Sequence, residues 1–167
     1  VGQAVQGDDA TVHDPDHIRP DLQRGRDRHA FTLDAARPAA VAKRHAQGGR
    51  TARENIADLR DDGSFIEYGA LAIAAQTRRR SKEDLIANTP ADGMVTGIGG
   101  INGALFGDEK SRTVVMSYDA TVLAGTQGVR NHAKTDRMLG IALALLPIAN
   151  ALGFIGLAIF GSFAALI

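Results

Sequence analysis

A polar turn flanked by glycines and followed by basic residues is the part of the sequence best suited to chemistry. The turn, residues 125–128, precedes a helical pattern that begins near residue 129. The start of a helix offers free backbone N–H groups and the positive end of the helix dipole, which favour phosphate or carboxylate. The positive side chains that follow within two turns are Arg130, His132, Lys134 and Arg137. The pattern predicts an anion site, although these residues could equally be only the exposed face of an amphipathic helix.

A second basic group lies earlier in the chain, at Arg78, Arg79 and Arg80. A run of three arginines is most often a solvated surface, but the fork geometry of arginine also suits an anionic ligand. No aromatic residue alternates with the run, so nucleic acid is not expected as a partner. We take these arginines as a second choice for the anion site, and we interpret His132 as a structural or surface residue and not as a general base.

The elements that must position the turn are a hairpin and the strand that leaves it. Residues 94–101 are typical of a glycine-rich strand, and Asn102-Gly103 predicts a two-residue hairpin turn. The strand pattern over residues 112–118 is the strongest in the chain. We therefore expect strand, hairpin, strand, turn and helix over residues 92–138.

The preceding residues predict smaller elements. A helix begins at Pro38 and ends before Gly48-Gly49. Thr51 and Glu54 have the spacing of a capping box, which starts another helix. Residues 64–68 indicate a short strand, and residues 81–89 a short helix or loop that Pro90 terminates.

Composition excludes several classes of function. Lysine plus arginine number 19 and aspartate plus glutamate also number 19, so no overall field favours nucleic acid or a membrane surface. Cysteine is absent, which excludes disulfides, thiolate metal sites and a cysteine nucleophile. The glycine spacing fits neither a dinucleotide-binding fingerprint nor a P-loop, and we predict no metal site.

The two ends of the chain differ sharply in composition. Residues 1–30 carry many charges and few large apolar side chains, which predicts a disordered segment or a linker. Residues 139–167 carry no charge and are long enough to cross a bilayer. The sequence near Val1 does not resemble a secretory signal, so we expect a cytoplasmic protein. The alternative is a protein associated with a membrane through this tail.

Four motifs occur in the order found in one enzyme family. They are Gly49–Glu54 (GRTARE), Asp61–Glu67 (DDGSFIE), Asp92–Gly99 (DGMVTGIG) and Asp119–Gly128 (DATVLAGTQG). With these motifs the chain resembles the carboxyltransferase (β-type) component of biotin-dependent acyl-CoA carboxylases, the group that includes the acetyl-CoA and propionyl-CoA carboxylases. The resemblance covers residues 31–146. It departs from the family at His132 and Lys134, which are spaced H-A-K where the family has H-x-x-K.

The resemblance implies an α/β fold of the crotonase type, with β-β-α units stacked in a spiral and, in this chain, only part of the domain plus an apolar C-terminal helix. It implies transfer of a carboxyl group from carboxybiotin to an acyl-CoA thioester. Biotin would be carried by a partner protein or domain, and no cofactor would be bound covalently. The implied partners are acyl-CoA, the biotin carboxyl carrier and biotin carboxylase components, and further copies of the same subunit.

The resemblance also makes CoA the predicted anion. Its phosphates are expected near Gly125, Thr126, Gln127, Gly128, Arg130 and Lys134, with Arg78, Arg79 and Arg80 as the second choice. No catalytic residue is expected in the chain, because the family stabilises its oxyanions with backbone N–H groups.

The glycine-rich loop that forms the family's first oxyanion hole is not found after residue 146, and the second hole belongs to a C-terminal half. We therefore expect residues 147–167 to be an apolar tail foreign to the family, as in a truncated or fused reading frame, and the chain alone to be inactive. The alternative hypothesis is a non-enzymatic protein that is tethered to a membrane, or to a partner, through residues 139–167.

Overall fold

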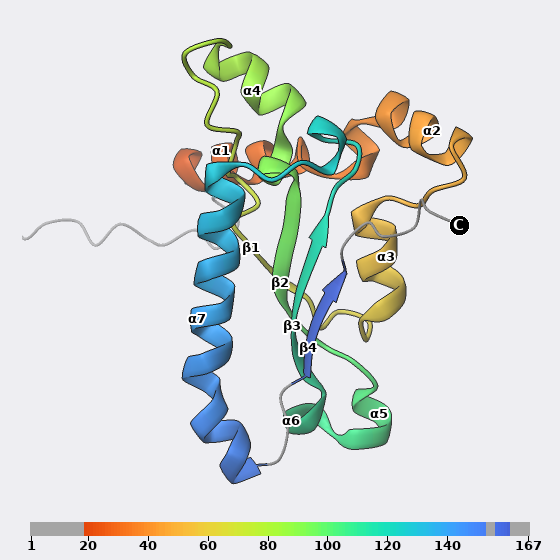
Figure 1. Cartoon of the computed structure of the whole chain (residues 1–167), viewed down its shortest axis with the longest axis vertical. Coiled ribbons are helices and arrows are strands. Elements are labelled where there is room, and N and C mark those ends of the chain that lie inside the picture. The colour runs from red at the N-terminus through yellow and green to blue at the C-terminus, as the bar shows by residue number, and fades with distance from the viewer. Residues whose placement is uncertain (1–18, 153–155, 161–167) are drawn as a thin grey trace, which may run out of the picture.

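A four-stranded sheet forms the centre of the computed structural model, which describes residues 19–152 and 156–160 (Figure 1). The strands are β1 (Ile66–Tyr68), β2 (Met94–Gly100), β3 (Arg112–Tyr118) and β4 (Gly156–Phe160), in the order β1-β2-β3-β4. The β1/β2 and β2/β3 pairs are antiparallel, whereas β3 and β4 are parallel. Strands β2 and β3 and the long helix α7 (Val129–Leu152) therefore form one β-β-α unit. Helix α7 then connects β3 to the parallel strand β4.

Helices cover both faces of the sheet, because the side chains of β2 and β3 alternate between two apolar clusters. On one face, Val95 and Val115 pack against Ala52 and Ile56 of helix α3 (Ala52–Leu59). On the other face, Met94, Val114 and Met116 pack against Met138 of α7. Figure 1 shows α7 and α3 on opposite sides of the strands.

The short helices begin where the sequence predicts. Helix α2 is Pro38–Ala46, and the Thr51–Glu54 capping box that starts α3 is present. Helix α4 is Lys82–Asn88, capped by Ser81, and packs through Leu85 against Ile73 and Ala74. The remaining elements are α1 (Pro20–Ala30), η1 (Asp34–Ala36), η2 (Pro90–Gly93), α5 (Gly103–Phe106), α6 (Asp108–Ser111) and η3 (Leu123–Gly125).

The prediction of a two-residue hairpin at Asn102-Gly103 is wrong. Residues 101–111 connect β2 and β3, and they contain α5 and α6. Asn102 is left-handed, with φ of 58°, as it would be in a tight turn, but it begins a helix instead. The carboxylate of Asp61 accepts the backbone N–H groups of Asn102 at 3.0 Å and Gly103 at 2.7 Å, which holds this start in place from a distant part of the chain.

The predicted linker over residues 1–30 is corrected at its C-terminal end, where Pro20–Ala30 forms α1; residues 1–18 lie outside the described part. Helix α1 buries no residue, which is why its composition indicated a linker. Polar contacts at its end attach it to the fold instead. Arg53 of α3 donates to the carbonyl and the hydroxyl of Thr32, just after α1, and a His29 ring nitrogen lies 3.3 Å from Glu67 of β1.

The apolar C-terminal segment is not one helix. Helix α7 runs through residue 146 without a break and ends at Leu152, and the apolar run at residues 156–160 forms β4 beside β3. A continuous apolar run suits a parallel strand, which is commonly covered on both faces. Among the described residues, no helix contains a stretch apolar and long enough to cross a bilayer. Residues 153–155 and 161–167 of the predicted tail lie outside the described part.

Candidate functional site

The predicted anion turn lies between η3 and α7, at one end of the sheet. Leu123, Ala124 and Gly125 are all left-handed, and glycine accommodates its φ of 73° without strain. The hydroxyl of Thr126 donates to the carbonyl of Leu123 at 2.7 Å, which closes the turn. Thr126 and Gln127 are exposed, and the first residues of α7 follow directly. The backbone therefore presents the start of a long helix to the surface.

The loop before this turn is held by charge. Asp119 follows β3 and accepts the backbone N–H of Thr121 at 2.9 Å and its hydroxyl at 2.6 Å. The other carboxylate oxygen of Asp119 accepts from Arg37 at 2.8 Å, and Arg37 also donates to the Thr121 hydroxyl. This ion pair ties the segment before α2 to the turn that precedes α7.

A buried carboxylate at the same helix start was not found by sequence reasoning. Asp92 is 1% exposed, and its Oδ2 accepts the backbone N–H of Asn131 at 2.7 Å. The side-chain amide of Asn131 donates to the Asp92 carbonyl at 3.3 Å. Burial raises the pKa of Asp92 above its usual range, against the lowering effects of the Asn131 N–H and of Lys134 and Arg130. Gly128 packs against this carboxylate, since a Cβ there would lie 3.1 Å from Asp92 Oδ2.

Lys134 points into the fold and not toward the exposed turn. Its Nζ donates to the carbonyl of Ala91 at 2.8 Å and also to that of Met94. These carbonyls flank three consecutive left-handed residues, Ala91, Asp92 and Gly93. Burial lowers the pKa of Lys134 to about 8, although the carboxylates of Glu67 and Asp92 act in the opposite direction. The side chain thus stabilises the turn that enters β2.

Arg130 connects the helix to the segment before α4. Its Nη1 donates to the carbonyl of Ile73 at 3.1 Å. With Lys134, Arg137 and Tyr68 it lines a cavity of about 230 Å³ between α7 and β1. His132 is exposed on the same helix. The basic residues of α7 therefore divide between a surface group and one partly buried cation, Lys134.

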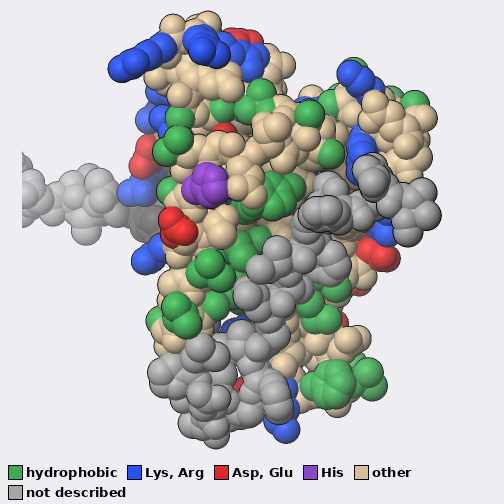
Figure 2. Space-filling model, in the orientation of Figure 1, with side chains coloured by type: hydrophobic (Ala, Val, Ile, Leu, Met, Phe, Trp, Pro, Cys, Tyr) green, Lys and Arg blue, Asp and Glu red, His purple; other side chains and the backbone are tan. Residues whose placement is uncertain are grey.

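The second arginine group lies close by. Arg78 and Arg79 are exposed, whereas Arg80 forms an ion pair with Asp84 of α4. A cavity of about 210 Å³ is lined by Ala74–Gln76 from this segment together with Asp92, Leu123 and Thr126–Val129. Figure 2 shows Lys and Arg side chains gathered over α4 and the loop before it. The cavity thus joins the predicted turn to residues 74–76, which precede the arginine run, but the arginines themselves do not line it.

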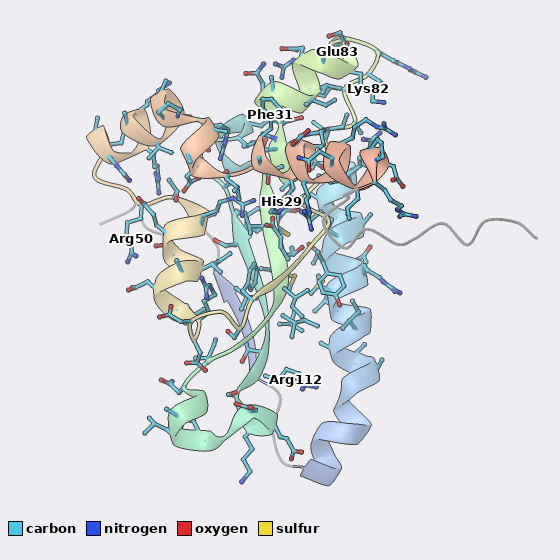
Figure 3. All side chains as sticks on the ribbon, turned by 180° about the vertical axis from the view of Figure 1, so that it is seen from behind. His29, Phe31, Arg50, Lys82, Glu83 and Arg112 are labelled. Atoms are coloured by element: carbon cyan, nitrogen blue, oxygen red, sulfur yellow. The ribbon has the colours of Figure 1, made fainter. Side chains whose placement is uncertain are left out.

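The earlier motifs have structural tasks. Arg53 places its two terminal nitrogens on the two oxygens of Glu67, each at 2.9 Å, and its Nε donates to the carbonyl of Thr32. Figure 3 shows His29 on the side of α1 that faces the sheet, beside this ion pair. Ser64 donates to the carbonyl of Asp61 and accepts the N–H of Gly100. These residues fix α1, α3 and the β2–α5 connection.

Comparison with known proteins decides the family. The model of the carboxyl transferase domain matches residues 43–159. The chain belongs to the carboxyl transferase domain family. The match reaches residue 159, beyond the boundary at residue 146 that the motifs indicated, and so includes all of α7 and nearly all of β4.

Subunits of acyl-CoA carboxylases are among the proteins to which the chain is similar. The propionyl-CoA carboxylase beta chain of Saccharopolyspora erythraea is 36% identical over 118 residues, which cover 70% of this chain and 19% of that protein. The biotin-dependent acetyl-/propionyl-coenzyme A carboxylase beta5 subunit of Mycobacterium leprae is 40% identical over 104 residues, covering 60% and 17%. The chain therefore spans about a fifth of the length of the curated relatives it matches.

Solved structures confirm the fold. A single-chain, multi-domain long-chain acyl-CoA carboxylase is 58% identical, with a TM-score of 0.80, over 88% of this chain and 14% of that one. Transcarboxylase 12S, solved with methylmalonyl-coenzyme A and methylmalonic acid bound, has a TM-score of 0.55 at 28% identity, over 77% of this chain and 23% of that one. The predicted resemblance and the crotonase-like α/β fold are both confirmed.

Proposed function

We propose that this chain forms the CoA-binding part of a carboxyltransferase that acts on acyl-CoA thioesters in biotin-dependent carboxylation, as in fatty acid or propionyl-CoA metabolism. The observation that carries the proposal is the cavity at the start of α7, which Ala74–Gln76 and Thr126–Val129 line within a fold shared with acyl-CoA carboxylases. Arg78 and Arg130 lie one or two residues beyond these lining segments. The phosphates of CoA lie near Thr126–Arg130 and near Arg78 and Arg79. Biotin is presented by a carrier that belongs to a partner protein or to another domain.

The residues of the cavity support binding and not acid–base chemistry. Its lining comprises backbone, small apolar side chains, a hydroxyl, two amides and the buried Asp92. Carboxyl transfer needs donors aimed at a developing oxyanion, and each such donor is worth on the order of 10²–10³ in rate. We propose that those donors come from parts of the enzyme beyond this chain, and that the chain alone binds CoA without transferring a carboxyl group.

The contacts of the basic residues indicate a different role for each of them in CoA binding. Arg78 and Arg79 are exposed and bear no ion pair among the described residues, so they are free to meet phosphate. Arg130 is partly used by the Ile73 carbonyl and keeps its second terminal nitrogen for a ligand. Lys134 supports the site from within, because its ammonium group already contacts two carbonyls.

Calorimetric titration of the chain with CoA tests the proposal. The double substitution Arg78→Ala/Arg79→Ala, and separately Arg130→Ala, should each weaken CoA binding about tenfold, the effect of losing roughly one charge-assisted contact. Arg112→Ala is the matched control, because Figure 3 places Arg112 at the end of the sheet opposite α4. No heat with CoA in the unaltered chain, or an equal loss in the control, would contradict the proposal.

A further inference from the structure

Asp92 lies at the start of α7 with half of its carboxylate unsatisfied. Its Oδ2 is used by the Asn131 N–H, but its Oδ1 is buried and has no hydrogen-bond donor among the described residues. The same is true of the side-chain oxygen of Asn131. Buried acceptors without donors are costly and rare in native proteins. A proton on Oδ1 of Asp92 would turn one of these two acceptors into a donor.

The carboxylate also shares a cavity with the predicted anion turn. The 210 Å³ cavity is lined by both Asp92 and Thr126–Val129. A Cβ on Gly128 would lie 3.1 and 3.2 Å from the two oxygens of Asp92, so the carboxylate is within contact distance of that backbone. An anion bound at the turn therefore meets the charge of Asp92 at short range, where water screens it little.

The charged groups around Asp92 do not cancel the repulsion between its carboxylate and a bound anion. Lys134 and Arg130, both from α7, act on Asp92 and favour its ionised form. Lys134 is itself influenced by Glu67 of β1 and Arg53 of α3, which form an ion pair with each other. The cavity lining from the segment before α4 and from the turn carries no titratable side chain. Asp92 is thus the one ionisable member of this lining.

We propose that Asp92 sets the charge selectivity of the anion site at α7: with a proton on its carboxyl group the helix start accepts an anion, and without that proton it opposes one. The inference rests on the proposed anion-binding role of this turn. It adds to that role a proton taken up when the anion binds. Asp92 is a positioning and selectivity residue, and it reacts with nothing.

The direction of the pH effect follows from burial. Burial raises the pKa of Asp92 above its usual range, so the neutral form persists to higher pH than for an exposed aspartate. Anion affinity should therefore fall as the pH rises through that pKa. Asn in place of Asp92 mimics the neutral form, since its oxygen still accepts the Asn131 N–H and its amide provides a donor. Asn also tolerates the left-handed backbone at this position better than most residues.

Sulfate is the probe, because its charge stays constant between about pH 5 and about pH 8. Its affinity for the full chain is measured by NMR titration of the backbone amides. The unaltered chain should lose about tenfold in sulfate affinity from the lower to the higher pH. Asp92→Asn should bind at both pH values as tightly as the unaltered chain does at the lower one. Asp136→Asn, a change at an exposed carboxylate of α7, should behave as the unaltered chain does.

His132 is an exposed histidine on α7, so His132→Gln is measured as a further control. The fall in affinity should persist in His132→Gln and disappear in Asp92→Asn. A pH-independent affinity in the unaltered chain, a fall retained in Asp92→Asn, or no sulfate binding at either pH overturns the inference. If CoA fails to bind while the sulfate dependence holds, only the proposed function fails; if CoA binds without this dependence, only the inference fails.

Discussion

The backbone N–H of Asn131 donates to Oδ2 of Asp92 over 2.7 Å, so a carboxylate 39 residues earlier in the chain caps the first turn of α7. The turn that carries Asp92 also enters β2, the strand at the centre of both apolar clusters. A single contact therefore joins the central sheet to the helix start where the anion site is proposed.

Replacing Asp92 by Ala should destabilise the chain by about 1–3 kcal/mol, because the Asn131 N–H loses its acceptor and alanine is disfavoured at a φ of 48°. Asp92→Asn keeps the acceptor and should cost less. Urea denaturation of both variants measures the difference. Equal losses in the two variants would show that the cap is not what Asp92 contributes.

The Asp92 carboxyl should also make stability depend on pH. Its folded-state pKa is raised above the unfolded value, so the native state binds the proton more tightly. The free energy of unfolding should therefore fall as the pH rises from the unfolded-state pKa through the folded-state pKa. Asp92→Asn removes this component, and the difference between the two pH profiles isolates it. A difference that grows in favour of the unaltered chain as the pH rises would contradict the sign.

Lys134 should make the free energy of unfolding depend on pH in the alkaline range. Its pKa is about 8 in the fold against 10.5 for the ordinary side chain, so the unfolded state binds more protons between these values. Stability should rise with pH across that interval, relative to Lys134→Met. Methionine keeps an apolar stem but offers no donor, so the carbonyls of Ala91 and Met94 lose a partner, at a cost on the order of 1–3 kcal/mol. Denaturation profiles that run parallel for the two proteins would rule out the shift.

The Arg53–Glu67 ion pair should matter far more than a surface pair. Arg53→Ala leaves the nearly buried Glu67 carboxylate without its bidentate partner and should cost about 3 kcal/mol. Arg50→Ala is the control, because Arg50 pairs with Asp58 at the exposed surface, where such a pair is worth about 1 kcal/mol or less. Similar midpoints of denaturation for the two variants would contradict this ranking. Hydrogen exchange in α1 should also rise in Arg53→Ala, since Arg53 holds Thr32.

Gly97 should tolerate no side chain. A Cβ there would lie 2.4 Å from the carbonyl oxygen of Ile66 and 2.5 Å from the ring of Phe65, so Gly97→Ala must displace β1 from β2. Gly140→Ala is the matched control within α7, where a Cβ meets nothing within 4 Å. It should stabilise the chain by about 0.5–1 kcal/mol through helix propensity. Thermal unfolding of both variants checks the opposite signs.

Sequence reasoning succeeded where local chemistry is decisive. The Thr51–Glu54 capping box, the strand over residues 112–118 and the start of α7 near Val129 depend on neighbouring residues, and the structure has them in place. The ordered motifs likewise predicted the family and the fold, which the comparisons confirm.

The errors arose where distant residues decide the conformation. Asn102-Gly103 has the composition of a tight turn, but Asp61 makes it the start of a helix. Helix α1 lacks an apolar face and is held by His29 and Thr32 through polar contacts. The inward orientation of Lys134 and the cap provided by Asp92 depend on tertiary contacts that no spacing along the chain reveals.

Amide chemical-shift mapping during a CoA titration shows whether CoA binds at the start of α7. We expect the largest shifts on residues 126–131 and on residues 74–80, with little change around Arg112 at the far end of the sheet. Shifts confined to the larger cavity lined by Asp61, Ile98, Arg112 and Ile141, or no shifts at all, would contradict it.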